Sequence, residues 1–414
     1  MRSVIVMGAG MIGVSTALHL RRRGLSVTLV DRRGVAEETS HGNAGIIQSE
    51  AVEPTPMPRD IAVLTRVALG LSNDVRYSFT SLPEHARPLA LYWWNSAPKR
   101  HQAIARHYAA LIAHAIPEHE TLIAQAGAEP LVRRNGYLFV HRSPRTYAEA
   151  IAKAERVGRT WGVPYRLLDP AGIRALEPAI TGDLVGAVHW TDPWSIADPG
   201  RLAQLYADLF TREGGEIATG DAQTLKETST GWSVRTEAGL IEADAAVIAL
   251  GPWSPQVLAP FGYRFDMVRK RGYHQHYAGG AAIERPTFDA GFGYVLAPMA
   301  RGLRLTTGAE FTGYDAPATP VQLARAEAAA RQLLTLGSPV DPAPWFGTRP
   351  FLAGMLPAIG PAPNHKGLWF NFGHGHQGFT LGPAAGRLLA EIMTGNGQPM
   401  IDPAPYDPAT IIRR

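Results

Sequence analysis

Residues 1–31, MRSVIVMGAGMIGVSTALHLRRRGLSVTLVD, decide which fold we expect for this chain. An apolar run, Val4–Met7, leads into a Gly-x-Gly-x-x-Gly pattern, then into a stretch with helical periodicity, then into a second apolar run that ends at Asp31. A strand, a glycine turn, a helix and a strand closed by an acid are typical of a dinucleotide-binding βαβ unit. The glycines alone would be a weak signal, so the assignment depends on the elements around them.

Each residue of this turn has a physical role in such a unit. Gly8 lets the chain leave the strand through a tight turn, Gly10 lets the backbone approach a pyrophosphate, and Gly13 lets the helix pack closely on the strand. Met11 and Ile12 open the helix, whose free N–H groups and positive dipole end face the pyrophosphate. We therefore assign all five residues to a cofactor site.

The residues after the second strand extend this predicted site. Asp31 can accept hydrogen bonds from a ribose diol, and we assign Arg32 to the same site. A loop of short polar side chains follows, so its backbone amides can lie against a flat ligand. Its members assigned to the cofactor site are Ser40, Asn43, Ala44 and Gly45.

Composition excludes several classes of protein. The 414 residues exceed the usual limit of a single hydrophobic core, so we predict two domains. The absence of cysteine excludes disulfides, thiolate metal sites and iron–sulfur clusters. A net charge of +4 without a long Lys/Arg run argues against nucleic-acid binding. His107, His114 and His119 lack the i, i+4 spacing of a zinc-binding helix, so we predict no metal site.

We expect a cytoplasmic protein, because the chain starts directly in a predicted strand and contains no apolar run of membrane-spanning length. Two interpretations are open for Tyr92-Trp93-Trp94, which lies near Arg87 and Lys99. It could form an interfacial belt that gives peripheral contact with the inner face of a membrane. Core packing is the interpretation that we favour.

Two later glycine turns also point to a cofactor. The strand Ala245–Leu250 ends at a Gly-Pro-Trp sequence, which suits a sheet edge beside a ligand, so Gly251 and Trp253 join the site. Near the C-terminus, the strand Leu368–Phe372 and the helix Phe379–Met393 enclose a second turn. All of that turn is assigned to the cofactor: Gly373, His374, Gly375, His376, Gln377 and Gly378. A flavin cofactor explains two turns, because a helix N-terminus stabilises the negative charge on its reduced ring.

The motifs together resemble the D-amino-acid oxidase/dehydrogenase superfamily of FAD enzymes, and most closely the bacterial D-amino-acid dehydrogenases. The resemblance runs nearly end to end. It is carried by Gly8–Gly13, by Thr39-Ser40 with Asn43-Ala44-Gly45, by Gly251-Pro252-Trp253, by Gly347-Thr348-Arg349-Pro350, and by Gly373-His374-Gly375 with Gly386-Arg387-Leu388-Leu389.

The resemblance implies an α/β fold with a Rossmann-like FAD-binding domain of the glutathione-reductase type. That domain is discontinuous, and the inserted substrate domain is α+β, built on a mixed or antiparallel sheet with helices. We place the FAD-binding domain at 1–57, 196–262 and 345–414, and the substrate domain at 58–195 and 263–344. The FAD is expected to be non-covalent, although His41 next to the loop leaves a covalent link as an alternative.

The resemblance also implies a reaction. The Cα hydrogen of an amino acid passes as hydride to flavin N5, the imino acid hydrolyses to a keto acid and ammonia, and a quinone or carrier protein accepts the electrons. Arg349 matches the substrate-carboxylate arginine of the family; the alternative is a structural arginine paired with a local acid. Tyr273, His274 and Tyr294 lie on predicted strands above the ring, and with His376 they are our candidate substrate-binding residues.

One departure from the family pattern bears on the substrate. Phe351-Leu352-Ala353-Gly354 stands where many members have a polar Thr-Pro-Asp-Gly. This favours a cyclic or apolar D-amino acid, such as D-proline or a hydroxyproline isomer. The alternatives are an oxygen-using glycine or sarcosine-type amine oxidase, a nicotinamide enzyme, and a non-catalytic flavin-binding or RNA-associated module.

Overall fold

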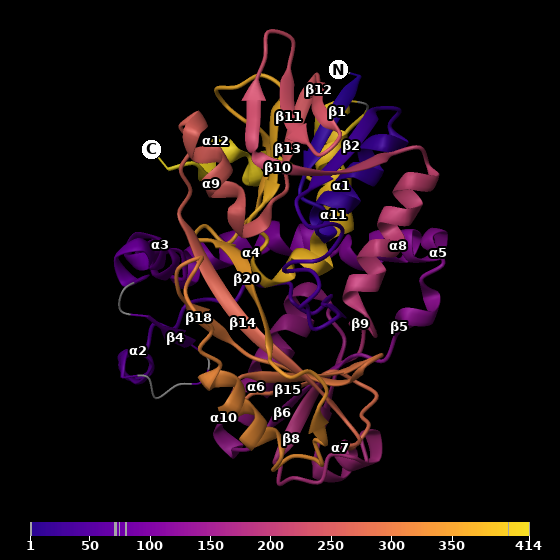
Figure 1. Cartoon of the computed structure of the whole chain (residues 1–414). Coiled ribbons are helices and arrows are strands. Elements are labelled where there is room, and N and C mark those ends of the chain that lie inside the picture. The colour runs from indigo at the N-terminus through magenta and orange to yellow at the C-terminus, as the bar shows by residue number, and fades with distance from the viewer. Residues whose placement is uncertain (1, 70–72, 74, 79–80, 396, 414) are drawn as a thin grey trace.

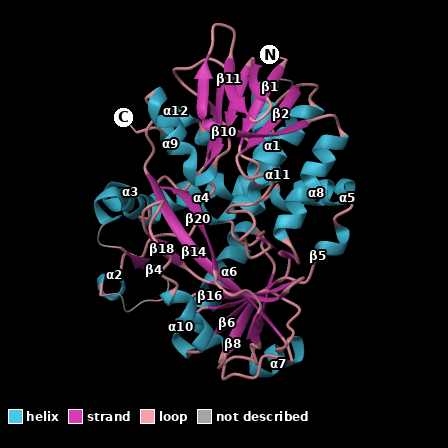
Figure 2. Ribbon diagram, viewed as in Figure 1, coloured by secondary structure: helices cyan, strands magenta, loops and turns pink. Residues whose placement is uncertain are grey.

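The protein consists of two large β-sheets with helices around them (Figures 1 and 2). The computed structural model describes residues 2–69, 73, 75–78, 81–395 and 397–413. The first sheet lies at the end of the molecule that also holds both termini, and the second sheet lies at the opposite end (Figure 1). A small three-stranded sheet contains β3 (Ile46–Ile47), β9 (Trp194–Ile196) and β5 (Val132–Arg133).

The first sheet has the parallel core of a dinucleotide-binding fold. Its eight strands run in the order β12-β11-β10-β2-β1-β13-β22-β21, and the central five are mutually parallel. The strands are β1 (Ser3–Met7), β2 (Ser26–Asp31), β10 (Glu216–Glu227), β11 (Trp232–Thr236), β12 (Gly239–Ala243), β13 (Ala245–Ile248), β21 (Ala358–Pro361) and β22 (Leu368–Phe372). Continuous apolar runs such as Val4–Met7 form central strands because both faces of the sheet are covered.

Three helices from distant parts of the sequence pack beside this sheet. They are α1 (Met11–Arg22), α8 (Pro199–Arg212) and α11 (Gly378–Thr394). Asp198 caps α8 by accepting the Arg201 N–H at 2.9 Å, as the Asp-Pro sequence predicts. A Cβ on Gly386 would lie 2.8 Å from the backbone of Ser15, so α11 and α1 are in close backbone contact. The start and the end of the chain are thereby joined.

The second sheet is mixed, as expected for the substrate domain. Nine of its eleven strands run in the order β4-β18-β14-β17-β16-β15-β6-β8-β7, and β19 and β20 also pair with β14. Most pairs are antiparallel, whereas β15–β6 and β18–β4 are parallel. The strands are β4 (Val75–Tyr77), β6 (Tyr137–His141), β7 (Tyr165–Leu168), β8 (Gly186–Trp190), β14 (Met267–Ala278), β15 (Thr287–Asp289), β16 (Tyr294–Met299), β17 (Gly302–Thr306), β18 (Ala309–Phe311), β19 (Ser338–Pro339) and β20 (Trp345–Leu352).

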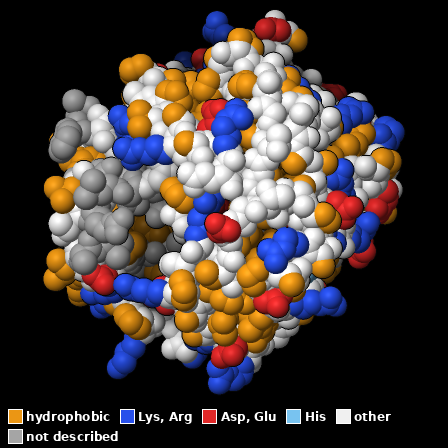
Figure 3. Space-filling model, turned by 90° about the horizontal axis from the view of Figure 1, so that it is seen from below, with side chains coloured by type: hydrophobic (Ala, Val, Ile, Leu, Met, Phe, Trp, Pro, Cys, Tyr) orange, Lys and Arg blue, Asp and Glu red, His pale blue; other side chains and the backbone are white. Residues whose placement is uncertain are grey.

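The remaining helices lie outside the sheets or between them. They are α2 (Ile61–Ala68), α3 (Leu82–Asn95), α4 (Pro98–Ile112), α5 (Ala115–Ala126), α6 (Pro144–Trp161), α7 (Pro170–Leu176), α9 (Ser254–Leu258), α10 (Val321–Ala330) and α12 (Pro408–Ile411). Within the described part of the chain, no helix has the length and apolar content needed to cross a bilayer. On the face in Figure 3, acidic and basic side chains are interspersed.

Two findings differ from the sequence-based domain assignment. Strand β20, which starts the predicted FAD-binding segment 345–414, pairs with β14 and so belongs to the second sheet. Helices α4 and α5, from the predicted substrate segment 58–195, pack against α11 beside the first sheet. Strand pairing and helix docking over long sequence distances decide both points, and neither leaves a local signal. The other domain boundaries remain proposals.

Candidate active site

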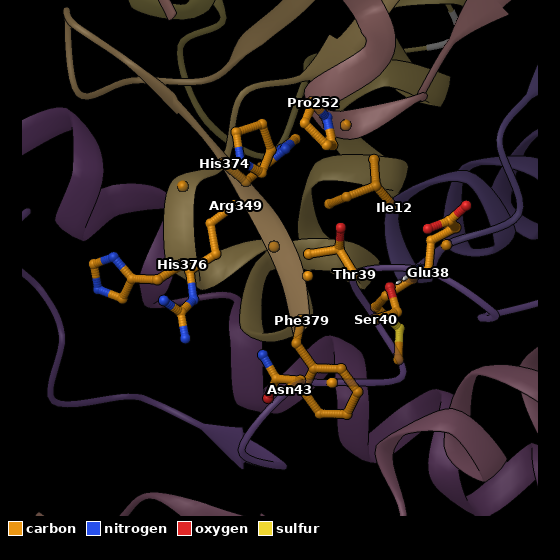
Figure 4. Close-up of a pocket in the computed structure, with 18 of the residues that line it drawn as sticks. Ile12, Glu38, Thr39, Ser40, Asn43, Pro252, Arg349, His374, His376 and Phe379 are labelled. Carbon is orange, nitrogen blue, oxygen red and sulfur yellow. Dashed lines mark hydrogen bonds between the residues drawn. The ribbon is translucent and has the colours of Figure 1, made fainter. Parts of the chain in front are cut away.

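One cavity of about 610 Å³ brings both glycine turns together (Figure 4). The N-terminal turn, the polar loop after β2, the turn after β22 and the end of β20 all contribute to its wall. Of the predicted cofactor residues, those in the wall are Gly8, Gly10, Met11, Ile12, Asp31, Arg32, Ser40, Asn43, Ala44, Gly251, Trp253, Gly373, His374, Gly375, His376 and Gly378. Gly13, Gly45 and Gln377 are adjacent in sequence but are not in the wall.

The N-terminal turn is shaped for close approach by a ligand. Gly8 has a φ of +102°, and a Cβ on it would lie 2.6 Å from the carbonyl oxygen of Ala249. A Cβ on Gly13 would lie 1.7 Å from the Gly8 carbonyl oxygen, so that position packs the turn rather than contacting the ligand. Ser40 Oγ accepts the Met11 N–H at 3.0 Å, and no side chain caps α1 at Gly10. The first N–H of α1 is thus bonded to the polar loop, and Gly10, Met11 and Ile12 lie in the cavity wall beside it.

Asp31 has local partners in addition to its place in the cavity wall. Its carboxylate accepts the Ala9 N–H at 2.8 Å and the Arg33 N–H at 2.9 Å, which holds the turn and the following loop together. Its contact with a ribose remains a prediction. The Arg32 guanidinium lies 5.0 Å from the ring centre of Trp253, so these two wall residues stack on each other.

The C-terminal turn contributes two neutral histidines to the cavity wall, of which His374 is buried and His376 is exposed. Gly373 and Gly375 have φ values of +90° and +62°, which allow the sharp turn between β22 and α11. Burial lowers the pKa of His374 to about 3. Desolvation within the cavity lowers the pKa of His376 to about 3 as well, with further contributions from the positive charges of Lys270 and Arg349. Both imidazoles are therefore uncharged at neutral pH.

Arg349 enters the cavity from β20 as a half-buried cation. Its Nη1 donates to the Gly308 carbonyl at 3.1 Å and its Nη2 to the Thr307 carbonyl at 3.4 Å. No carboxylate among the described residues pairs with it, so the alternative of an arginine paired with a local acid finds no support. Burial lowers its pKa. Figure 4 shows its guanidinium beside His376. A guanidinium in a cavity wall without an acid partner favours an anionic ligand group.

The three aromatic candidates from the second sheet are placed differently from one another. Tyr273 is in the wall, but its hydroxyl donates to Glu310 at 2.6 Å. His274 stacks on Trp345, with ring centres 4.8 Å apart, and lies outside the wall. The Tyr294 hydroxyl donates to Asp289 at 3.0 Å, and this residue also lies outside the wall. Since side chains alternate along a strand, Tyr273 and His274 cannot face the same side.

Sequence reasoning missed much of the wall near Arg349. That wall contains Thr306, Thr307 and Gly308 at the end of β17, and Gly347 on β20. The only local signal was a polar Thr-Thr-Gly at the end of an alternating strand.

Phe351 and Leu352 are buried outside this wall, in the hydrophobic core. The departure from the family pattern at these positions therefore carries no direct information about the substrate side chain.

The aromatic run on α3 is divided between core and surface. Tyr92 is buried and packs on Phe351, with ring centres 4.6 Å apart, so core packing is confirmed for this residue. Trp93 and Trp94 are 37% and 53% exposed, and core packing is wrong for them. The guanidinium groups of Arg59 and Arg100 stack on these two rings.

The sequence of the chain matches a family of redox enzymes. The family model described as FAD dependent oxidoreductase (DAO) matches residues 3–392. A D-amino-acid oxidase from Bradyrhizobium diazoefficiens is 28% identical, with 99% of each chain covered. A D-amino acid dehydrogenase from Chromohalobacter salexigens is 30% identical, with 98% of each chain covered. A glycine oxidase from Pseudomonas aeruginosa is 28% identical, again with 98% of each chain covered.

Solved structures share the fold at lower identity. Glycine oxidase from Geobacillus kaustophilus has a TM-score of 0.72 at 20% identity, with 98% of each chain covered. Iminodiacetate oxidase from Chelativorans has a TM-score of 0.71 at 22% identity, also with 98% of each chain covered. The similarity therefore includes both sheets.

Proposed function

The chain belongs to the DAO family of FAD-dependent oxidoreductases, and on that premise we propose that it oxidises a D-amino acid and passes the electrons to a quinone or another carrier. The family, the two-part fold and the FAD cofactor predicted from the sequence are confirmed. The D-amino acid substrate, the electron acceptor and a cytoplasmic location are parts of the proposal.

The residues of the cavity fit FAD. Gly8 and Gly10 bring backbone without side chains to the cavity wall, as close approach by a pyrophosphate requires, and the second turn lines the same cavity. His41 is not in the cavity wall, whereas its neighbours Ser40 and Gly42 are. This placement supports a non-covalent flavin.

The observation that carries the proposal is the uncompensated guanidinium of Arg349 in the cavity that holds both glycine turns. A guanidinium fork matches a carboxylate in a bidentate geometry. It would hold the acid group of an amino acid and so restrict where the Cα can lie. Positioning of this kind is a large part of catalysis when the cofactor supplies the chemistry.

FAD, when bound, would supply the acceptor for a hydride from Cα, and a C=N bond would form as the substrate nitrogen gives up a proton. Arg349 orients the substrate through its carboxylate. The neutral His374 and His376 add no positive charge beside an amino group, and their low pKa makes them weak bases for the ammonium proton. Water then hydrolyses the released imino acid to a keto acid and ammonia.

Anaerobic flavin bleaching tests the proposal. The panel contains D-, L- and N-methyl amino acids, with D-proline and a hydroxyproline isomer among them. We expect D-amino acids to bleach the flavin. We expect Arg349→Met to slow bleaching by about 100-fold or more with its FAD content unchanged, because a bidentate bond between two charged groups is lost. Arg349→Lys, which keeps the charge without the fork, should be intermediate. Equal bleaching by Arg349→Met would contradict the carboxylate role.

An oxygen-using glycine or sarcosine-type amine oxidase is the second candidate. The wall near Arg349 contains Gly308 and Gly347, which suit a substrate without a large side chain, and glycine oxidases are among the relatives. Hydrogen peroxide measured at saturating substrate separates the two. Stoichiometric peroxide from glycine or sarcosine would support the oxidase. Little peroxide, with rapid reduction of an added quinone, would support the dehydrogenase.

A further inference from the structure

Arg304 connects the second sheet to the polar loop of the cofactor cavity. The residue lies on β17, and only 4% of its surface is exposed. Its Nη1 donates to the carbonyl oxygen of His41 at 3.1 Å and also to that of Asn43. Both carbonyls belong to the loop whose neighbouring residues Ser40, Asn43 and Ala44 are in the cavity wall. A single buried guanidinium thus bonds two alternate peptide groups of one loop.

A histidine and an aspartate fix the Arg304 guanidinium on the side away from the loop. Arg304 Nε donates to His276 Nε2 at 3.0 Å, so this ring nitrogen carries no proton. The other ring nitrogen, Nδ1, faces Asp341 Oδ2 at 3.4 Å. Asp341 also pairs with the exposed Arg301 at 2.7 Å. Because burial lowers the pKa of His276 to about 4, the imidazole stays neutral and keeps accepting from Arg304 at neutral pH.

The geometry of the peptide group means that the bonds from Arg304 also orient N–H groups on the opposite side of the loop. In a planar trans peptide the C=O and N–H groups point in opposite directions, and the described chain contains no cis peptide bond. The carbonyls of His41 and Asn43 share their peptide groups with the N–H groups of Gly42 and Ala44. Binding both carbonyls to Arg304 therefore turns both N–H groups away from the second sheet.

Gly42 and Ala44 are in the cavity wall, and neither N–H donates to an acceptor among the described residues. Backbone N–H groups inside a protein almost always have an acceptor, so two unsatisfied donors at a cavity wall require one from a ligand or water. Gly42 also has no room for a larger residue, because a Cβ there would lie 1.8 Å from the Trp345 ring.

We propose that Arg304 is a positioning residue that aims the N–H groups of Gly42 and Ala44 at the bound FAD. The inference rests on the FAD assignment and not on the choice of substrate. Donors directed at the flavin stabilise the negative charge that reduction adds, so they should raise its reduction potential. The second sheet would in this way adjust a cofactor bound mainly by the first sheet.

The test compares Arg304→Met with the control Arg301→Met. Both remove one positive charge near Asp341, but the hydrogen bond and ion pair of Arg301 among the described residues are both with Asp341 and not with the loop. FAD is titrated into the apoprotein, and the visible spectrum and reduction potential of the bound flavin are measured without substrate. We expect Arg304→Met to bind FAD about tenfold or more weakly, with a shifted spectrum and a lower potential. Arg301→Met should match the wild type.

Arg304→Gln serves as a second variant, because a side-chain amide keeps one donor for the loop. We expect its FAD affinity and potential to lie between those of the wild type and Arg304→Met. If Arg304→Met does not fold, Arg304→Gln must still show weaker FAD binding and a lower potential. The proposal would be overturned if the FAD affinity, the visible spectrum and the reduction potential all kept their wild-type values in whichever variant folds. Because no substrate is present, failure of the proposed D-amino acid oxidation would not affect this result.

Discussion

The guanidinium of Arg349 lies directly over Gly272, with Nη1 and Nη2 each 2.7 Å from the point where a Cβ on Gly272 would stand. The two residues are on the paired strands β20 and β14, and Gly347 faces Gly272 in the register. The absence of a side chain at Gly272 therefore leaves the space in which the arginine reaches the cavity.

Gly272→Ala should displace this guanidinium without unfolding the protein, because the clash is with the end of a flexible side chain. We expect the FAD content to be unchanged and kcat/KM for the amino acid to fall by about tenfold or more, mainly through KM. Gly354→Ala is the matched control, since a Cβ there meets no atom within 4 Å. A wild-type KM in Gly272→Ala would show that Arg349 does not bind substrate in this position.

Gly10→Ala and Gly13→Ala should have different effects. A Cβ on Gly10 meets only Ser40 Oγ, at 3.1 Å, so the protein can accept it and the methyl group would instead crowd the cofactor. We expect normal thermal stability of the apoprotein with weaker FAD binding. Gly13→Ala places a Cβ 1.7 Å from the Gly8 carbonyl and should lower the stability of the apoprotein itself. Calorimetry of both apoproteins and FAD titration separate the cases, and equal apoprotein stability would contradict the prediction.

Glu50 should make stability depend on pH. Burial raises the pKa of this carboxyl from 4.5 to about 7; Oε1 accepts from Gln48 at 2.8 Å, and Oε2 has no partner among the described residues. Between pH 4.5 and pH 7, Glu50 is therefore protonated in the folded state and ionised in the unfolded state. The contribution of this residue to stability is present below pH 4.5 and is lost as the pH rises through that window.

Glu50→Gln mimics the protonated form and should remove this loss. We expect the free energy of unfolding of the variant, relative to that of the wild type, to increase by about 1–3 kcal/mol from pH 5 to pH 8. This value follows from the free energy equivalent of the pKa shift. Unfolding measured at both pH values checks the change. The same substitution at the exposed Glu120 should leave the difference between the two pH values unaltered. If the free energies of unfolding of Glu50→Gln and the wild type differed by the same amount at both pH values, Glu50 would not hold a proton in the folded state.

His376→Gln should leave the pH profile of the reaction in place. The pKa of His376 is lowered to about 3, so its charge does not change between pH 5 and 9. We expect kcat/KM to change in magnitude while the inflections of its pH profile stay at the same values. Loss of an inflection near neutral pH in His376→Gln would instead identify this imidazole as the group that takes the amine proton.

The first 31 residues predict the N-terminal βαβ unit, and the turn at Gly373–Gly378 predicts its C-terminal counterpart. The sequence alone sufficed here because a tight turn, a close approach and a helix start are each set within a few residues. Arg349 could be selected from the sequence for a similar reason, because the short motif that contains it resembles the family.

Long-range pairing decided the rest of the site. Tyr273 lies in the cavity wall and His274 does not, because they lie on opposite faces of β14. Which face is turned to the cavity depends on the register of β14 with β17 and β20. The bond from Arg304 to His41 joins residues 263 positions apart in the chain. Side chains alternate between the faces of a strand, so only the assembled sheets determine which residues line the cavity and which hold its loop from behind.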